Sequence, residues 1–493
     1  MNYDIVLITT DQHRVDYTGF GKNSQIPTPN MDFLGDGCVF NRCVSANPVC
    51  APARTALLTG KYTHQINMLT MAGDLDLQHP TYARALQNAG YHTSLVGKTH
   101  WLQGWPFDKT KTPRGQGHNL VENNDQLKRF GFDHLWDVSG QELAYRDYCF
   151  WCRHLERHGI LEDYRDHLET FSDIDMPNAV MPEVVPWPFE PEHQADSVIG
   201  QQCVEAIESA PDDAPMFLHA SFCGPHKPLN APEEMLERAD ALLESADNRD
   251  IPRLDGVGEV DEEWRKRWEE WRRGYVAKVA VIDDQVGRIM GALRERGRLD
   301  RTIILFTSDH GEMLGDEKQE GKSRPQWPSS RVPTAIYHPD YQSRKRVSTP
   351  VEMTDLTATI LDAAGLNPQD ALSKSFPAHN DHVLCRSLMP IIRGETEKIR
   401  DMAFSEHTHW RMVESQDFKY VYRPAESLSG EPEEFLCRID EEPLDVNNLA
   451  GDPEYAEVLE AHRRYMHNVM DQTPPAQQRW VPFPARDISD ELP

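Results

Sequence analysis

Short runs of apolar and β-branched residues alternate with longer helical patterns along this chain, and this alternation limits the folds that it can adopt. Four of the runs read as buried strands, at residues 4–10, 91–96, 216–222 and 302–307. Helical patterns separate them, at residues 81–89, 193–209 and 274–296. Strands that alternate with helices over this length predict an α/β domain built around a mostly parallel sheet.

Polar side chains follow each of the four predicted strands. They are Asp11 and Gln12 after the first strand, Lys98 and His100 after the second, His226 and Lys227 after the third, and Asp309 and His310 after the fourth. In open α/β sheets, ligands bind beyond the carboxyl ends of the strands. The acids, histidines and lysines at these ends therefore predict one shared site.

The length of the chain predicts two domains, because a single hydrophobic core stops growing at roughly 250–300 residues. We expect a large α/β domain over residues 1–395 and a smaller α+β domain over residues 396–493. Residues 104–190 are rich in Asp, His, Trp and Pro and have weak periodicity, so we interpret them as a loop-rich insertion that carries substrate-specific contacts. In the smaller domain we expect strands at 402–406, 411–414 and 420–423 and a helix at 453–470.

The charge and hydropathy of the chain exclude two classes of partner. A formal net charge of −29 argues against a general nucleic-acid binder, which would carry a basic face. No apolar run approaches the roughly 20 residues that a membrane helix needs, so we expect no membrane partner. The first residues have neither a basic segment nor a small-residue cleavage site, so they do not read as a signal peptide, and we expect a cytoplasmic location.

The nine cysteines are odd in number and scattered without a framework, which is typical of reduced thiols. Cys149 and Cys152 form a lone CxxC pair with no second pair at zinc-site spacing. We interpret these two as ordinary thiols on an aromatic-rich segment.

Cys50 opens the most specific motif in the sequence. Residues 50–61, CAPARTALLTGK, resemble the sulfatase signature, C-x-P-x-R followed by L-T-G, at every fixed position. The resemblance implies that a formylglycine-generating enzyme oxidises Cys50 to formylglycine, whose hydrated aldehyde is the nucleophile. It also implies the fold of the alkaline-phosphatase superfamily, a mostly parallel mixed sheet sandwiched by helices, followed by a smaller domain with an antiparallel sheet and a helix.

The same resemblance implies one divalent cation at the strand ends. Sulfatases place metal ligands at positions that match Asp11, Asp309 and His310, and the matured Cys50 completes the set. Gln12 stands where many family members carry a second aspartate, and its amide oxygen still suits a hard cation without adding charge. Oxygen ligands favour Ca²⁺, while the imidazole leaves Mn²⁺ open and Mg²⁺ is a further alternative.

Five more residues match sulfatase positions that act on the substrate. The segment Gly97-Lys98-Thr99-His100 resembles the second family signature, which implies that Lys98 stabilises sulfate and that His100 accepts a proton. His226 and Lys322 match residues that protonate or stabilise the leaving oxygen. Arg54 of the first signature favours the anionic nucleophile.

The function that these motifs imply is hydrolysis of a sulfate ester, and we expect a carbohydrate sulfate, hence a small anionic saccharide partner. Aromatic and basic side chains that could stack on sugar rings occur at Trp101, Trp105, Trp136, Trp151 and His154, and again at residues 407–411. The alternative for most of these tryptophans is a place in the core, which is the commoner one. The alternative is a phosphonate monoester or phosphodiester hydrolase of the same superfamily, which shares the Asp-Gln and Asp-His pairs. Lys98 and His100 favour the sulfatase. A binding protein that has lost catalysis is a third alternative, and the retained cysteine and carboxylates argue against it.

Overall fold

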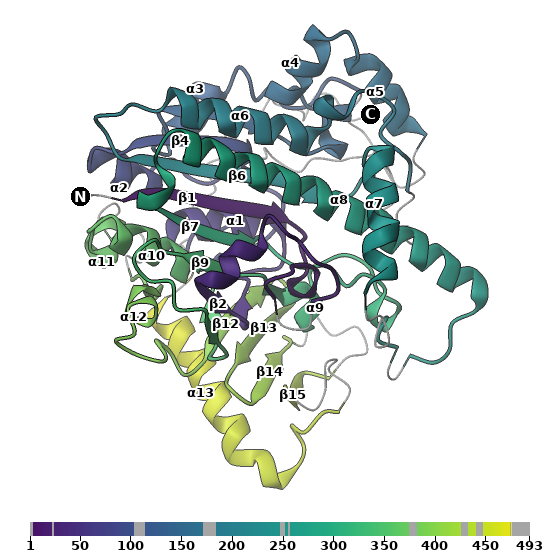
Figure 1. Ribbon diagram of the computed structural model, residues 1–493. Helices are drawn as coiled ribbons and strands as arrows, with labels where there is room; N and C mark the ends of the chain where they lie inside the picture. The colour runs from purple at the N-terminus through teal and green to yellow at the C-terminus, as the bar shows by residue number, and fades with distance from the viewer. Residues whose placement is uncertain are drawn as a thin grey trace, which may run out of the picture.

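The main sheet of the computed structural model has eight strands in the order β10-β2-β9-β7-β1-β6-β4-β5 (Figure 1). Neighbouring strands run parallel except where β9 pairs with β2 and β7. The strands span β1 Asp4–Asp11, β2 Cys38–Phe40, β4 His92–Lys98, β5 His134–Val138, β6 Met216–Pro225, β7 Thr302–Ser308, β9 Ala335–Tyr337 and β10 Lys345–Val347. The structure describes residues 3–21, 24–102, 114–170, 184–246, 252–254, 257–373, 382–424, 432–439, 447–473 and 475.

The centre of this sheet is covered on both faces. Every residue of β1 and β6 is buried, and successive side chains of a strand point to opposite faces. The predicted α/β fold, with a mostly parallel sheet sandwiched by helices, is therefore confirmed. Helices α6 (Ala195–Ser209) and α8 (Glu262–Glu295) pack on β6, whereas α2 (Tyr82–Asn88) packs on β4 and contacts α1 (Cys50–Thr59) and α10 (Asp355–Ala363).

The four predicted strands correspond to β1, β4, β6 and β7, and two other segments differ from expectation. The helix expected at 274–296 begins earlier, at Glu262, where the Asp261 side chain accepts a hydrogen bond from the Trp264 amide at 2.7 Å. Segment 104–190 was expected to be loop-rich, but it contains the edge strand β5, which is too short to show periodicity in the sequence. It also contains helices α3 (Asn124–Lys128), α4 (Phe150–Arg157) and α5 (Leu161–Glu169), while residues 103–113 and 171–183 lie outside the described part of the chain.

The C-terminal part forms the expected antiparallel sheet and helix. Strands β12 (Ala403–His407), β13 (Trp410–Glu414), β14 (Phe418–Tyr422) and β15 (Glu434–Arg438) follow one another in order, and α13 (Ala456–Gln472) packs on β13 and β14. Figure 1 shows this unit below the main sheet. The small sheet β11-β3-β8 adjoins it through β12. The remaining elements are β3 Cys43–Val44, β8 Arg331–Val332, β11 Val351–Glu352, α7 Glu233–Glu244, α9 Trp327–Ser330, α11 Pro368–Leu372 and α12 Met389–Ile392.

The cysteines and the helices bear on two expectations from the sequence. All nine cysteines lie in described segments and carry free thiols, and the Sγ atoms of Cys149 and Cys152 are 3.5 Å apart without a disulfide. Within the described ranges, no helix combines the length and apolarity that crossing a bilayer would require.

Ion pairs hold the C-terminal sheet against the small sheet β11-β3-β8. Glu414 on β13 is buried between Arg42, just before β3, and Arg331 of β8, with 3.1 Å to Arg42 Nε and 3.1 Å to Arg331 Nη2. Burial alone would raise the pKa of Glu414, but Arg331 and Arg42 outweigh it and hold that pKa below its usual value of 4.5. The charged carboxylate is therefore part of the native packing.

Replacing Glu414 with glutamine should destabilise the protein at pH 7 by about 3–5 kcal/mol, because the buried Arg42 and the partly buried Arg331 lose their charged partner. The stability gained from this group is present above pH 4.5 and is lost as pH falls below that value, since its folded pKa is depressed. Urea unfolding at pH 7 and at acid pH measures both effects. The matched control is Glu434→Gln, whose partner Arg463 is partly exposed, and we expect it to cost about 1 kcal/mol or less. Equal losses in the two variants would contradict this account.

Candidate active site

The strand ends bring the predicted side chains together around Cys50. Asp11 is the last residue of β1 and Lys98 the last of β4, while Asp309 follows β7 directly. These strands belong to one parallel set, so their carboxyl ends meet at one edge of the sheet. Cys50 is the first residue of α1, where free backbone amides and the helix dipole favour negative charge.

Asp11, Cys50, Asp309 and His310 form a buried cluster whose possible ligand atoms all lie within 4.8 Å of one another. The Cys50 Sγ atom is 3.2 Å from His310 Nε2 and 3.6 Å from Asp11 Oδ1. The other ring nitrogen of His310, Nδ1, donates to the Gly311 carbonyl at 2.9 Å. This bond leaves the lone pair of Nε2 facing the cluster, as a metal ligand requires.

Gln12 provides the observation that tests whether a cation fits here. Its backbone is left-handed, with φ of 63°, and its amide N–H donates to Asp309 Oδ1 at 3.0 Å. Its side-chain Nε2 donates to Glu312, but its Oε1 atom is buried without a hydrogen-bond partner. A buried amide oxygen without a donor is costly unless something electropositive meets it. The residues present therefore fit one divalent cation held mainly by oxygen.

Arg54 bridges the two carboxylates of this cluster. Its Nε atom lies 2.8 Å from Asp309 Oδ2, and its Nη2 atom lies 3.2 Å from Asp11 Oδ2. Its Nη1 atom donates to the Lys98 carbonyl at 2.9 Å. Burial would lower the pKa of Arg54, but Asp309 and Asp11 outweigh it and raise that pKa. Arg54 therefore holds the two carboxylates in position beside Cys50.

Two lysines place positive charge at the cluster. Lys98 Nζ is 2.8 Å from Asp11 Oδ2, whereas Lys322 Nζ donates to Cys50 Sγ at 2.7 Å. For both lysines burial would lower the pKa, and the negative neighbours outweigh it so that the pKa is raised. The pKa of Asp11 is held well below its usual range, because Lys98, His226 and Arg54 outweigh the effect of burial, which would raise it. Both lysines therefore remain cationic beside position 50.

His226 lies within hydrogen-bond distance of Lys322. Its Nδ1 atom donates to the Lys227 carbonyl at 2.7 Å, so a neutral ring has its lone pair on Nε2. Lys322 Nζ lies 3.0 Å from that Nε2 atom. On the Nδ1 side, Glu142 Oε1 is 3.8 Å away. Glu142 comes from the segment expected to be loop-rich. No motif in the sequence marks it as a site residue.

His100 is held as a neutral ring with one free nitrogen. Its Nε2 atom donates to the Ser139 carbonyl at 2.6 Å, while its Nδ1 atom is buried without a partner. Burial, Lys98 and Arg54 together hold the pKa of His100 well below its usual value. A neutral imidazole with an unused lone pair is able to accept a proton.

The aromatic residues predicted to meet a sugar divide into two groups. Trp101 and Trp151 are buried, and Trp101 stacks on Phe132 with ring centroids 5.6 Å apart, so these two belong to the core. Trp136 is also buried, and Trp105 lies outside the described residues. The 407–411 stretch instead lies near the site, since Trp410 Nε1 donates at 3.0 Å to the carbonyl of Ser323, the residue after Lys322.

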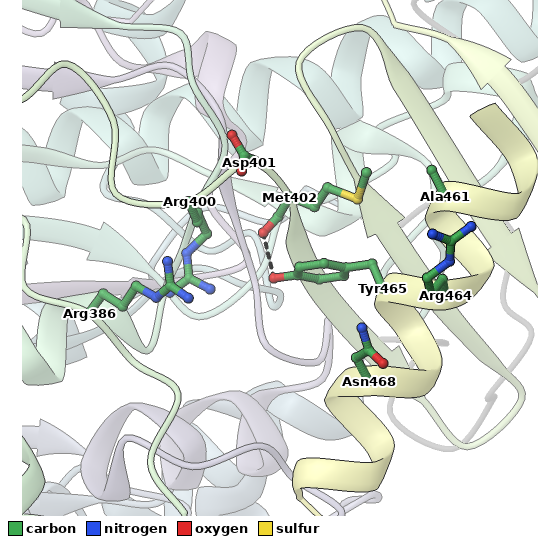
Figure 2. A pocket seen from close by; sticks show the side chains of 8 residues that line it. All are labelled: Arg386, Arg400, Asp401, Met402, Ala461, Arg464, Tyr465 and Asn468. Atoms are coloured by element: carbon green, nitrogen blue, oxygen red, sulfur yellow. Dashed lines mark hydrogen bonds between the residues drawn. The ribbon is translucent and has the colours of Figure 1, made fainter. Parts of the chain in front are cut away.

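A separate cavity of about 300 Å³ lies between α13 and the chain before β12 (Figure 2). Figure 2 shows Tyr465 across this cavity, where its hydroxyl donates to the Met402 carbonyl at 2.7 Å. The cavity shares no lining residue with the cluster at Cys50 and is not the candidate active site. Its lining residues are Arg386, Arg400, Asp401, Met402, Ala461, Arg464, Tyr465 and Asn468.

Comparison with known proteins gives one consistent result. The family model described as Sulfatase matches residues 3–366. An arylsulfatase of Clostridium perfringens is 27% identical, over 94% of this chain and 94% of that protein. An N-acetylglucosamine-6-O-sulfatase of Bacteroides thetaiotaomicron is 25% identical, over 92% of this chain and 83% of its own length. The structure of the phosphonate monoester hydrolase of Agrobacterium radiobacter superposes with a TM-score of 0.70 at 24% identity, covering 95% of this chain and 96% of that one, and shows the shared fold.

Proposed function

Because this chain belongs to the sulfatase family of sulfuric ester hydrolases, we propose that it hydrolyses a carbohydrate sulfate with a formylglycine made from Cys50 and one divalent cation, Ca²⁺. The observation that carries the proposal is the setting of Cys50. Its Sγ atom lies at the start of α1, 2.7 Å from Lys322 Nζ and 3.2 Å from His310 Nε2. A nucleophilic oxygen at the same position would be stabilised as an anion by these groups.

Two groups supplied after synthesis complete the chemistry. A hydrated formylglycine at position 50 supplies two hydroxyls, one that attacks sulfur and one that later expels sulfate, so that one hard step becomes two easier ones. A cation held by Asp11, Gln12, Asp309 and His310 supplies positive charge to the nucleophile and the sulfate oxygens. We infer Ca²⁺ from the oxygen-rich ligand set, with Mg²⁺ or Mn²⁺ as alternatives.

Lys98 and Lys322 neutralise the sulfate group in this reaction. Both ammonium groups are held next to the cluster, by Asp11 and by position 50 respectively. In a site closed to water, each charge interacts with sulfate oxygens more strongly than it would in bulk solvent. Because transfer shifts negative charge toward the leaving oxygen, Lys322, which is paired with His226, stabilises the transition state more than the ground state.

The pair of His226 and Lys322 delivers a proton to the leaving oxygen. Lys322 Nζ donates toward His226 Nε2 at 3.0 Å, so a proton can be supplied by either member of the pair. His100 acts in the second step, where its free Nδ1 accepts a proton from position 50 as sulfate is expelled. The lowered pKa of His100 keeps this nitrogen unprotonated before the step.

A saccharide substrate is supported by a relative and by the C-terminal turn. The N-acetylglucosamine-6-O-sulfatase is similar to this chain over most of both sequences. The turn between β12 and β13 adds polar and aromatic side chains beside Lys322, through the bond from Trp410 to Ser323. Hydrolysis of a phosphonate monoester is the second candidate, favoured by the shared fold with the Agrobacterium hydrolase. Lys98 and His100 favour the sulfate ester.

The proposal is tested by co-expression with a formylglycine-generating enzyme, followed by measurement of inorganic sulfate released from sulfated mono- and disaccharides, aryl sulfates and a phosphonate monoester. We expect release from at least one sugar sulfate, loss on chelation with recovery on adding Ca²⁺, and no turnover in Cys50→Ala. Cys203→Ala, which alters another buried thiol on α6, is the matched control and should retain turnover. Efficient cleavage of the phosphonate alone would move the protein to the second candidate.

Substitution of His226 by alanine should depend on the leaving group. We expect kcat/KM to fall about 10²–10⁴-fold for alkyl sulfates, whose alkoxide needs a proton, and far less for nitrophenyl sulfate, whose phenolate leaves unaided. A plot of rate against leaving-group pKa measures this difference as a steeper slope in the variant. An unchanged slope would rule out the proton-delivery role.

A further inference from the structure

Three histidines gather around α4, a helix at the top of Figure 1 and well apart from α1. His154 and His158 are four residues apart along α4 and its C-cap, so they share one face of the helix. His193 ends the short helix η4 (Pro191–His193), directly before α6. The ring centroids are 4.7 Å apart for His154 and His158, 5.1 Å for His154 and His193, and 4.2 Å for His158 and His193.

The ring nitrogens of these residues point toward one another. His154 Nε2 is 3.0 Å from His193 Nδ1, and one nitrogen from each of the three rings lies within 4.8 Å of the others. Two nitrogens bound to the same tetrahedral zinc ion, each at about 2.0–2.1 Å, are separated by roughly 3.4 Å. The observed spacing therefore needs only small ring rotations to reach a metal-binding geometry.

Burial and the charges around the cluster favour the neutral form of His154. Burial, His158, His193 and Arg157 lower the pKa of His154 to about 4, and Glu205 on α6 opposes this shift. Metal ions bind the neutral form of imidazole, so no proton has to be displaced from His154 at neutral pH. In the neutral form, His154 and His193 share one hydrogen bond between Nε2 and Nδ1 at 3.0 Å, which a bound ion would replace with two metal–nitrogen bonds.

We propose that His154, His158 and His193 bind one divalent transition-metal ion of the zinc type, at a site separate from the cation beside Cys50. An all-imidazole set favours zinc and its transition-metal neighbours over Ca²⁺, which prefers oxygen. His158 is exposed, so the fourth position is open to water. The two sites should therefore bind different metals on the same chain.

The backbone around the cluster is already fixed. Trp151, buried on α4, donates from Nε1 to the His193 carbonyl at 3.0 Å, and the His193 amide donates to the Glu190 carbonyl at 3.0 Å. These bonds hold α4 and the segment before α6 at a set distance, which reduces the ordering needed on binding. A bound ion would join the two segments and stabilise the native state in proportion to its occupancy.

The test is isothermal titration of the whole, Ca²⁺-saturated protein with ZnCl₂, together with melting temperatures with and without Zn²⁺. His158→Ala, which removes an exposed ligand, and His154→Ala should each weaken one Zn²⁺-binding event at least tenfold and reduce the Zn²⁺-dependent rise in Tm. His467→Ala, which removes an exposed histidine on α13, is the matched control and should behave as wild type.

Any Zn²⁺ that enters the site at Cys50 is common to all four proteins and cancels in the comparison. Equal Zn²⁺ stoichiometry and affinity in wild type, His158→Ala and His154→Ala would overturn the proposal. Absence of any Zn²⁺ binding to the wild type would overturn it as well. Neither outcome bears on sulfate release, which is measured separately.

Discussion

The site depends on one buried arrangement, the bridging of Asp11 and Asp309 by Arg54. Two carboxylates that face the same point repel each other, and burial makes the repulsion stronger. Arg54 contacts both, at 3.2 Å and 2.8 Å, and its place on α1 puts Cys50 one helical turn away. The arginine thus links the ends of β1 and β7 to the residue that we propose as the nucleophile.

The second support of the site comes from the C-terminal sheet. Glu414, at the end of β13, lies between Arg42 and Arg331, and Trp410, at the start of the same strand, donates to the carbonyl of Ser323 beside Lys322. The C-terminal sheet therefore contacts the segment that carries Lys322, one of the lysines that we propose to act on the sulfate.

Much of this arrangement could be predicted from the sequence, and the rest could not be predicted. Buried strands that end in Asp11, Lys98 and Asp309 predict a shared edge, because parallel strands place their carboxyl ends together. Contacts across long sequence separations gave no local signal. The approach of Glu142 to His226 is set by an edge strand and a short helix within a polar segment, and the burial of Trp101 depends on neighbours such as Phe132. Composition alone therefore could not decide which tryptophans contact a sugar and which belong to the core.

The central claim is that catalysis resides in a modified residue 50, and it is tested most directly by relating activity to modification. Preparations made with graded amounts of the formylglycine-generating enzyme are analysed by peptide mass spectrometry for the fraction of Cys50 converted, and each is assayed for sulfate release. The account predicts that the rate rises in proportion to the converted fraction and extrapolates to zero at zero conversion. A rate that is independent of conversion would contradict it.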